Sequence, residues 1–317
     1  KGEGAYDELQ RLCTANIKDE IGKCTYTHML NEGGGIETDL TVVCINKNHF
    51  RIISSAAVRT HDKAHILKHL SKDVEFKDVT DDLICLGIFG PKSRELLSKI
   101  TNENLSNEKF KFGTSKNINI GSSKVWTQRL SYVGELGYEL YINKDNGKEI
   151  YDLIVETGKN FGLTHCGAHT MDTMRMESGF LHWGHDISPE ENQYEAGLNF
   201  TISYKKPFNF IGKEKLLALK NQKLNRRFVM LILKDSTPGQ PLLLHEEPIY
   251  LENEIIGKTT SGNYSFNYDK NLSFGYINSE LTNEELLNRD LYIEIEKKKY
   301  EAQILLKPLK QVSFKDI

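Results

Sequence analysis

The sequence has few cysteines and no long apolar run, and each of these absences excludes a class of protein. The five cysteines are odd in number and widely scattered, and no CxxC pair occurs. A disulfide framework or a zinc knuckle needs closely spaced thiol pairs, so we expect neither. No apolar run is long enough to cross a membrane, and no signal peptide opens the chain. We therefore predict a cytoplasmic protein, or a mitochondrial matrix protein in a eukaryote, with no membrane partner.

An excess of charge of one sign is also missing. The 41 Lys and Arg residues nearly balance the 44 Asp and Glu residues, which leaves a net charge of −3. Local clusters such as Lys297 to Lys299 are typical of solvated strands or turns rather than of a nucleic-acid interface. No GxGxxG motif follows a predicted strand, so we expect no dinucleotide site within these residues. Nucleic acid is thus not an expected partner.

The chain is long enough for two or three domains with sizeable cores. Helical spacing and alternating strands are mixed until about residue 222. From Arg226 to the end, short alternating strands are separated by Gly, Asn and Asp turns, which predicts a separate all-β domain. The first residue is Lys1, and the opening segment resembles a strand end that enters a helix, so we expect the sequence to be part of a longer polypeptide.

The stretch SYVGELGYELYI, residues 131–142, reads as a turn followed by a strand. Because alternate strand residues share a face, Glu139 and Tyr141 point one way, while Tyr138, Leu140 and Ile142 point to a core. A carboxylate can accept two parallel N–H groups, as on the edge of a pterin, and a tyrosine can pack on such a ring. The alternative interpretation is an exposed strand face with a solvated glutamate.

A second candidate is NEGGGIETDLTVV, residues 31–43, in which a glycine turn leads into a strand. Acids rather than a lysine follow the glycines, which argues against a phosphate loop. Asp39 lies inside an apolar strand, where a carboxylate is unfavourable unless it is paired or functional. It is the best candidate for a general acid or base, and a structural role is the alternative.

A third segment contains His182, His185 and Asp186 as an HxxHD cluster, downstream of Asp172 and Arg175. The spacing of Asp172 and Arg175 predicts an ion pair along a helix. No further ligands converge on the two histidines in the sequence, so we predict no metal site.

Five motifs occur in an order that resembles a known family. They are YTHMLNEGGGIETDLTV, SYVGELGYELY, MDTMRMESGFLHWGHDISPEENQYEAGLNF, FIGKEKL and GKTTSGNYS. The same order is found in the folate-binding half of sarcosine and dimethylglycine dehydrogenases, which is itself similar to the aminomethyltransferase (T-protein) of the glycine cleavage system. The resemblance covers nearly the whole chain.

This resemblance implies an α+β fold, a three-domain cloverleaf around a central channel for tetrahydrofolate, with a C-terminal barrel-like β domain. We expect a discontinuous first domain at 1–48 and 118–222, an α+β domain at 49–117 and the β domain at 223–317. The resemblance also implies folate contacts at nine residues: Tyr26, Asp39, Leu40, Thr41, Tyr132, Glu139, Leu140, Tyr141 and Phe200. Of these, Asp39 would stabilise or relay protons at the folate nitrogens, and Glu139 would fix the pterin.

Two departures distinguish the branches of this family. The T-protein has two consecutive aspartates where this chain has Thr38 and Asp39, and Asp39 can replace the first only if the strand is bulged or the roles differ. The T-protein has Arg-Asp where this chain has Met171 and Asp172. The HWGHDI segment resembles the sarcosine dehydrogenase branch.

The resemblance therefore implies the tetrahydrofolate-binding region of a sarcosine/dimethylglycine dehydrogenase-like flavoenzyme. A covalently linked upstream domain with FAD would oxidise a small methylated amine, and this region would capture the one-carbon unit as 5,10-methylenetetrahydrofolate. Three alternatives stay open: a free-standing aminomethyltransferase, a folate-dependent demethylase of another methylated osmolyte, and a non-catalytic regulatory subunit.

Overall fold

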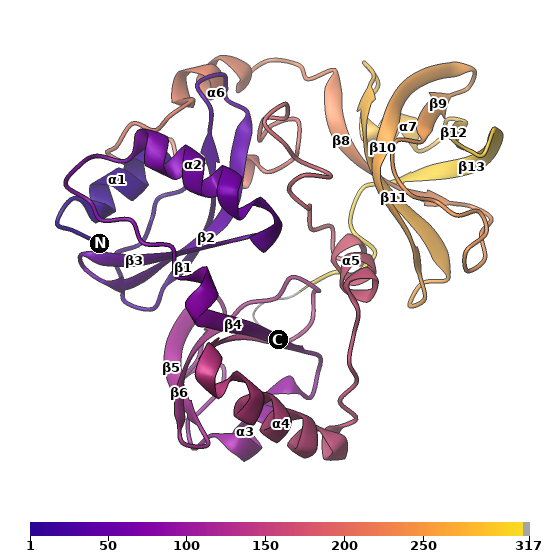
Figure 1. The fold of residues 1–317 in the computed structure, drawn as a ribbon. Coiled ribbons are helices and arrows are strands. Elements are labelled where there is room, and N and C mark those ends of the chain that lie inside the picture. Colours follow the sequence, from indigo (N-terminus) through magenta and orange to yellow (C-terminus); the bar gives the residue numbers. More distant parts are fainter. Residues whose placement is uncertain (313–317) are drawn as a thin grey trace.

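The computed structural model describes residues 1–312, which form three lobes (Figure 1). The first lobe is built on an antiparallel sheet in the order β1-β2-β3. Its strands are β1 (Cys24–Leu30), β2 (Ile36–Asn46) and β3 (His49–Ser54), and its helices are α1 (Ala5–Leu12), α2 (Arg59–His69) and α6 (Lys213–Leu219).

The β1–β2 hairpin depends on its glycines. Gly34 has φ of +89°, which favours glycine, and a Cβ on Gly35 would lie 1.9 Å from the Pro189 carbonyl oxygen. Inner positions of β2 alternate with half-buried ones, so Thr38 and Leu40 face the core while Asp39 faces the other way. The turn therefore fixes which residues of β2 leave the core.

The second lobe holds a four-stranded antiparallel sheet in the order β4-β7-β6-β5. Helices α3 and α4 pack on one face of it, and their apolar residues share one core with the strands. As predicted, Tyr138, Leu140 and Ile142 are buried in that core, while Glu139 and Tyr141 lie on the opposite face. The elements are β4 (Leu83–Phe89), α3 (Ser93–Ile100), β5 (Thr114–Ile120), β6 (Ser123–Arg129), β7 (Gly137–Asn143) and α4 (Gly147–Gly158).

The third lobe confirms the predicted all-β domain. It is a closed barrel in the order β10-β11-β8-β13-β12-β9, with one apolar core of its own. Closure leaves no free sheet edge. The elements are β8 (Arg226–Leu233), β9 (Pro248–Leu251), β10 (Glu254–Ser265), β11 (Lys270–Asn278), α7 (Asn283–Leu286), β12 (Leu291–Ile295) and β13 (Lys298–Leu305).

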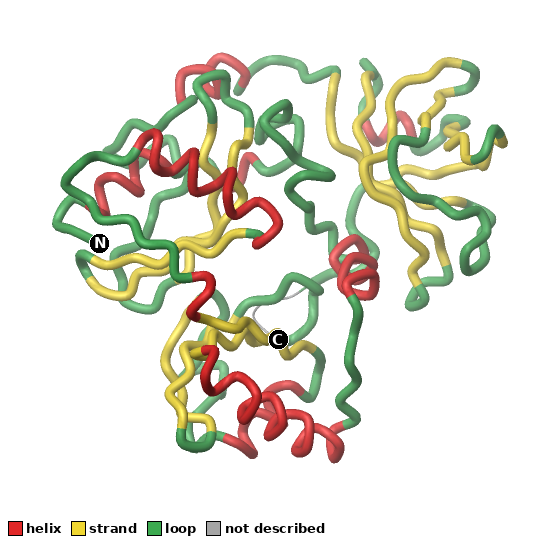
Figure 2. The backbone as a smooth tube through the Cα atoms, in the orientation of Figure 1, coloured by secondary structure: helices red, strands yellow, loops and turns green. Residues whose placement is uncertain are grey.

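Helix α5 (Ala168–Glu177) lies between the second lobe and the barrel, and long loops connect the lobes (Figure 2). Short 3-10 helices occur in these connections and within the lobes. They are η1 (Ala56–Val58), η2 (Thr80–Asp82), η3 (Lys144–Asn146), η4 (Lys159–Phe161) and η5 (Asn199–Thr201). Within residues 1–312, none of the helices combines the length and the apolar character needed to cross a membrane.

The sheets divide the chain at positions other than the predicted boundaries. A boundary at residue 49 cuts the β2–β3 hairpin, in which Asn46 pairs with His49. A boundary at 118 falls inside β5, which with β6 and β7 continues the sheet that begins with β4. The physical reason is that strands adjacent in sequence pair as antiparallel hairpins, so a boundary falls before α2 or after α4 rather than between hairpin strands.

The buried position of Leu140 gives the first prediction. Its side chain is fully buried in the core of the second lobe, so Leu140→Ala should lower the free energy of unfolding by about 2–5 kcal/mol. Urea denaturation measures this, with Asn119→Ala on the exposed face of β5 as the control. An unchanged unfolding free energy would place the Leu140 side chain outside the core.

Candidate functional site

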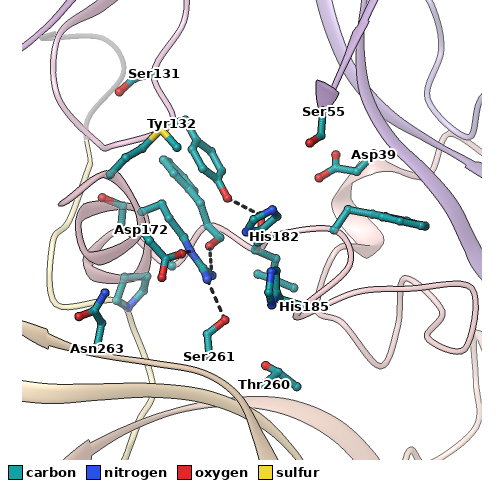
Figure 3. A pocket seen from close by; sticks show the side chains of 18 of the residues that line it. Asp39, Ser55, Ser131, Tyr132, Asp172, His182, His185, Thr260, Ser261 and Asn263 are labelled. Carbon is teal, nitrogen blue, oxygen red and sulfur yellow. Dashed lines mark hydrogen bonds and ion pairs between the residues drawn. The ribbon is translucent and has the colours of Figure 1, made fainter. Parts of the chain in front are cut away.

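All three lobes and α5 contribute to one cavity of about 1800 Å³. Strands β1 and β2 supply one wall, β4 and β7 a second, and the β8–β9 loop with β10 a third. Figure 3 shows Asp39 and Ser55 on one side, Tyr132 and Asp172 on the other, and His182 and His185 between them. The site thus joins residues that are far apart in sequence.

Seven of the nine predicted contact residues line this cavity. They are Tyr26, Asp39, Leu40, Thr41, Tyr132, Glu139 and Phe200. The Leu140 side chain does not, because β-strand alternation turns it into the core of the second lobe. Tyr141 is not in the lining either, although its hydroxyl donates a 2.8 Å hydrogen bond to Glu139 Oε2 and so acts on the lining indirectly.

Asp39 faces the cavity from β2, and its cross-strand neighbour on β1 is His28. Asp39 Oδ1 lies 3.7 Å from His28 Nε2 and is buried with no hydrogen-bond partner among the described residues. Burial raises the pKa of Asp39 to about 7; the Tyr26 hydroxyl opposes the shift, and the charge of Asp62 on α2 adds to it. Asp39 is therefore a carboxyl group that changes its charge near neutral pH.

Thr38 cannot share this role. Its side chain is fully buried on the opposite face of β2, where Thr38 Oγ1 accepts a 3.2 Å hydrogen bond from the Met29 backbone N–H. The strand pair is also bulged here, since Met29 pairs with Thr38 but Leu30 pairs with Ile36. Of these two neighbouring residues, Asp39 is thus the one whose side chain reaches the cavity.

Glu139 enters the cavity from β7, opposite Gly87 of β4. Burial raises the pKa of Glu139, and the hydrogen bond from Tyr141 works against that shift. Tyr141 is in turn held against the Trp126 ring, with centroids 4.8 Å apart. A Cβ on Gly87 would lie 2.4 Å from the Phe89 ring, so the glycine lets this ring pack against β4 near the carboxylate.

Aromatic and apolar side chains make up much of the remaining wall. Phe200 in η5 has 73% of its surface exposed although it lies in the lining. Tyr132 stacks on Phe180 and donates its hydroxyl to the Leu181 carbonyl oxygen at 3.2 Å. Such surfaces suit a flat, largely apolar ligand. Five further large apolar side chains of the lining are exposed too: Met171, Leu242, Leu244, Phe266 and Leu306.

Among the described residues Arg175 is the one arginine of the lining, and each of its three nitrogens makes at least one hydrogen bond. Its Nε binds Asp172 at 2.7 Å, which confirms the predicted ion pair along α5. Its Nη1 binds Asp186 at 2.5 Å, and its Nη2 donates to Ser261 of the barrel at 2.8 Å. Asp186 also accepts from Thr260 at 2.6 Å. The cluster is structural, and the described residues of the lining include no other lysine or arginine.

The two histidines of the HxxHD cluster line the cavity, with ring centroids 4.6 Å apart. Asp186 is not available to a metal ion beside them, because both of its oxygens are hydrogen-bonded. Among the described residues no group of three or more His, Cys, Asp and Glu side chains could hold a metal ion.

His28 is a site residue that the sequence analysis missed. Its fully buried imidazole contacts the Tyr26 hydroxyl through Nε2 at 3.2 Å. A signal was present in the sequence, because Tyr26 and His28 are two residues apart and would share a face if this segment were a strand, as it is in β1. Their proximity to Asp39 depends on the register of the hairpin, which the sequence alone did not specify.

Two family models match this chain: the GCVT N-terminal domain over residues 1–206 and the glycine cleavage T-protein C-terminal barrel domain over residues 226–310. The chain therefore belongs to the glycine cleavage T-protein family, as the motifs implied. Its fold resembles the crystal structure of the glycine cleavage system aminomethyltransferase T from Bartonella henselae, with a TM-score of 0.84 at 19% identity, covering 98% of this chain and 83% of that one.

Two curated relatives show the range of the family. Human mitochondrial dimethylglycine dehydrogenase is 34% identical over 314 residues, covering 98% of this chain but only 35% of the human protein. The aminomethyltransferase of Thermoanaerobacter sp. (strain X514) is 32% identical over 317 residues, covering 99% of this chain and 84% of that protein. The chain thus spans about a third of the length of the dehydrogenase and most of the transferase.

The buried Asp39 carboxyl predicts a specific dependence of stability on pH. Its pKa is about 7 in the folded chain against an ordinary value of 3.8. As the pH rises, the unfolded chain therefore loses this proton at a lower pH than the folded chain does. The resulting contribution to wild-type stability is present below about pH 4 and is lost as the pH rises to about 7. Asp39→Asn has no such group. Its free energy of unfolding should therefore rise by about 1–3 kcal/mol relative to that of wild type as the pH increases over this interval.

Urea unfolding of both proteins between about pH 4 and about pH 8 measures this difference. Asp145→Asn, on an exposed 3-10 helix, controls for the removal of a carboxylate. Parallel stability curves for wild type and Asp39→Asn would contradict the raised pKa.

Proposed function

We propose that this cavity binds tetrahydrofolate and transfers a one-carbon unit to it, and that the chain is the folate-binding region of a sarcosine/dimethylglycine dehydrogenase-like flavoenzyme. One observation carries this proposal. A Glu139 carboxylate lies in the same aromatic-walled cavity as an Asp39 oxygen that has no hydrogen-bond partner in residues 1–312. The family to which the chain belongs supports it, as does the dehydrogenase among its relatives.

The donor and acceptor groups of this wall fit a pterin. A pterin edge presents two parallel N–H groups, and Glu139 offers a carboxylate whose Oε2 is fixed by Tyr141, while none of the described residues donates a hydrogen bond to Oε1. Tyr26, Tyr132 and Phe200 provide ring surfaces in the same cavity. Asp39 Oδ1 offers a further hydrogen-bond acceptor in the same cavity, on strand β2, whereas Glu139 is on β7.

Bound tetrahydrofolate would supply the nucleophilic nitrogens that accept the one-carbon unit. Glu139 binds and orients the pterin, and Tyr141 holds the carboxylate of Glu139 in place. Asp39 accepts or returns a proton at a folate nitrogen, because a pKa of about 7 lets the carboxyl group do both near neutral pH. Apolar side chains of the barrel line the same cavity.

Two features of the wall support the dehydrogenase branch. Met171 lines the cavity at the position where the T-protein resemblance has an arginine, and Arg175 is ion-paired to Asp172 and Asp186. The charged groups left in the lining are carboxylates, which favour a cationic donor such as an iminium formed on an N-methyl amine. We infer that FAD binds to another part of the polypeptide, and the unpaired cysteines favour the cytoplasm or a mitochondrial matrix.

The aminomethyltransferase reading is the main competing function, because the chain covers 84% of the Thermoanaerobacter transferase. A folate-dependent demethylase of another methylated osmolyte would use the same cavity with a different amine. A non-catalytic regulatory subunit would bind folate without one-carbon transfer.

Glu139→Gln should weaken tetrahydrofolate binding by about 1–3 kcal/mol, because an amide cannot accept both N–H groups of the fork. Calorimetric titration of the chain measures the dissociation constant. Glu149→Gln on the exposed face of α4 is the matched control and should leave the affinity unchanged. Equal affinity of wild type and Glu139→Gln would contradict a role in folate binding and support the alternative interpretation, in which Glu139 is a solvated residue on a strand face.

The choice between branches depends on the one-carbon donor. We expect the chain to bind tetrahydrofolate but not to turn over an aminomethylated lipoyl carrier protein, because its wall lacks a free cation at Met171. The full-length polypeptide should couple oxidation of sarcosine or dimethylglycine to methylenetetrahydrofolate formation. Rapid turnover of the carrier by the chain would instead assign it as an aminomethyltransferase.

A further inference from the structure

The buried imidazole of His28 contacts the candidate site on one side and its supporting loops on the other. Through Nε2 it meets the Tyr26 hydroxyl at 3.2 Å and lies 3.7 Å from Asp39 Oδ1. Through Nδ1 it meets Thr201 Oγ1 at 3.2 Å and Gln193 Nε2 at 3.0 Å. No charged side chain contacts Nδ1 among the described residues, so this network consists of neutral groups.

Thr201 fixes the direction of the hydrogen bonds around it. It donates its one hydroxyl hydrogen to the Leu198 carbonyl oxygen at 2.7 Å. The 2.6 Å contact between Gln193 Nε2 and Thr201 Oγ1 must therefore use an amide hydrogen of Gln193. One lone pair of Thr201 remains, and it faces the imidazole of His28.

Gln193 has two amide hydrogens and three acceptors within reach. These are Thr201 Oγ1 at 2.6 Å, Thr14 Oγ1 at 3.0 Å and His28 Nδ1 at 3.0 Å. If Gln193 donates to Thr14, then His28 Nδ1 carries the proton and donates to Thr201. If Gln193 donates to His28 Nδ1, then the ring proton is on Nε2. The network therefore accommodates both neutral tautomers.

We propose that His28 is a positioning residue whose two neutral tautomers accompany the two protonation states of Asp39, with the Tyr26 hydroxyl as the link. When Asp39 is ionised, Nε2–H donates to Tyr26, and the Tyr26 hydroxyl donates to the carboxylate. When Asp39 is protonated, its O–H donates to Tyr26, the Tyr26 hydroxyl donates to Nε2, and the ring proton is on Nδ1.

In both arrangements each hydrogen has an acceptor, so Asp39 can change charge without leaving a buried donor unpaired. The loss or gain of one proton at Asp39 is balanced by exchange with the bound ligand or solvent, and His28 stays neutral throughout. The role in catalysis rests on the proposed function, but the coupling of tautomer to Asp39 does not need folate.

The charged and titratable groups around Asp39 come from three elements. Tyr26 and His28 face it from β1, Asp62 acts from α2, and Tyr132 approaches from the loop before β7. Burial lowers the pKa of His28 to about 3, and burial with the charge of Asp39 raises the pKa of Tyr26 well above its ordinary value. Near neutral pH, Asp39 is therefore the member of the trio that titrates.

Nitrogen-15 NMR of histidine-labelled protein tests this coupling without folate, since the shifts of Nδ1 and Nε2 report which nitrogen carries the proton. His28→Asn assigns the His28 signals among the ten histidines. From about pH 5.5 to about pH 8.5 we expect the proton to move from Nδ1 to Nε2 with a midpoint near the pKa of Asp39. In Asp39→Asn the tautomer should not depend on pH.

Thr38→Val is the matched control, because Thr38 is the neighbour of Asp39 on the other face of β2. It should keep the pH-dependent change of tautomer. A His28 tautomer that is constant in wild type over this range, a change that persists in Asp39→Asn, or titration of His28 to an imidazolium would each overturn the proposal.

A kinetic experiment tests the role of His28 in one-carbon transfer. His28→Asn keeps a group near the position of Nδ1 but removes Nε2, so it should lower the one-carbon transfer rate at least about tenfold while changing folate affinity less than about threefold. In the Asp39→Asn background the same change should cause little further loss. Full additivity of the two losses would show that His28 does not act through Asp39. If no folate binds to wild type, the proposed function fails, and the NMR result still decides the coupling.

Discussion

The buried pair of Arg175 and Asp186 is the interaction on which the architecture around the cavity depends. Both side chains are almost fully buried, and such a pair is favourable only if its remaining donors and acceptors are satisfied. Here Asp172 and the Phe180 carbonyl take two guanidinium hydrogens, and Ser261 of the barrel binds both charges. Helix α5, the loop that follows it and strand β10 are therefore fixed to one another at a single point.

Beside this fixed point, three lobes with separate cores share one cavity. Each lobe packs its own apolar cluster, and the walls between them carry polar groups that would be unfavourable in a core. The Asp39 and Glu139 carboxyl groups come from different sheets, and burial raises the pKa of both. Raised pKa values of carboxyl groups in a cleft are typical of functional sites. The two carboxyl groups thus reach one cavity from two different sheets.

Local rules predicted much of this structure from the sequence. Strand alternation placed Glu139 opposite the core residues Tyr138 and Leu140, and the change of pattern at Arg226 marked the barrel. The same rules gave no information on which sheets meet. The predicted boundaries divided hairpins, Leu140 was assigned to a ligand although its side chain faces a core, and His28 was overlooked because its role depends on the register opposite Asp39. Register and lobe contacts arise from long-range packing, which no single segment encodes.

The central claim is that Glu139 and Asp39 contact different parts of one bound tetrahydrofolate. A crystal structure of the chain with a stable reduced folate tests it most directly. The account predicts the amino-pyrimidine edge of the pterin within hydrogen-bond distance of Glu139, and the reactive nitrogens nearer to Asp39 Oδ1 than to any other carboxylate. A folate bound with its pterin on the barrel side of the cavity, away from both carboxyl groups, would contradict the account.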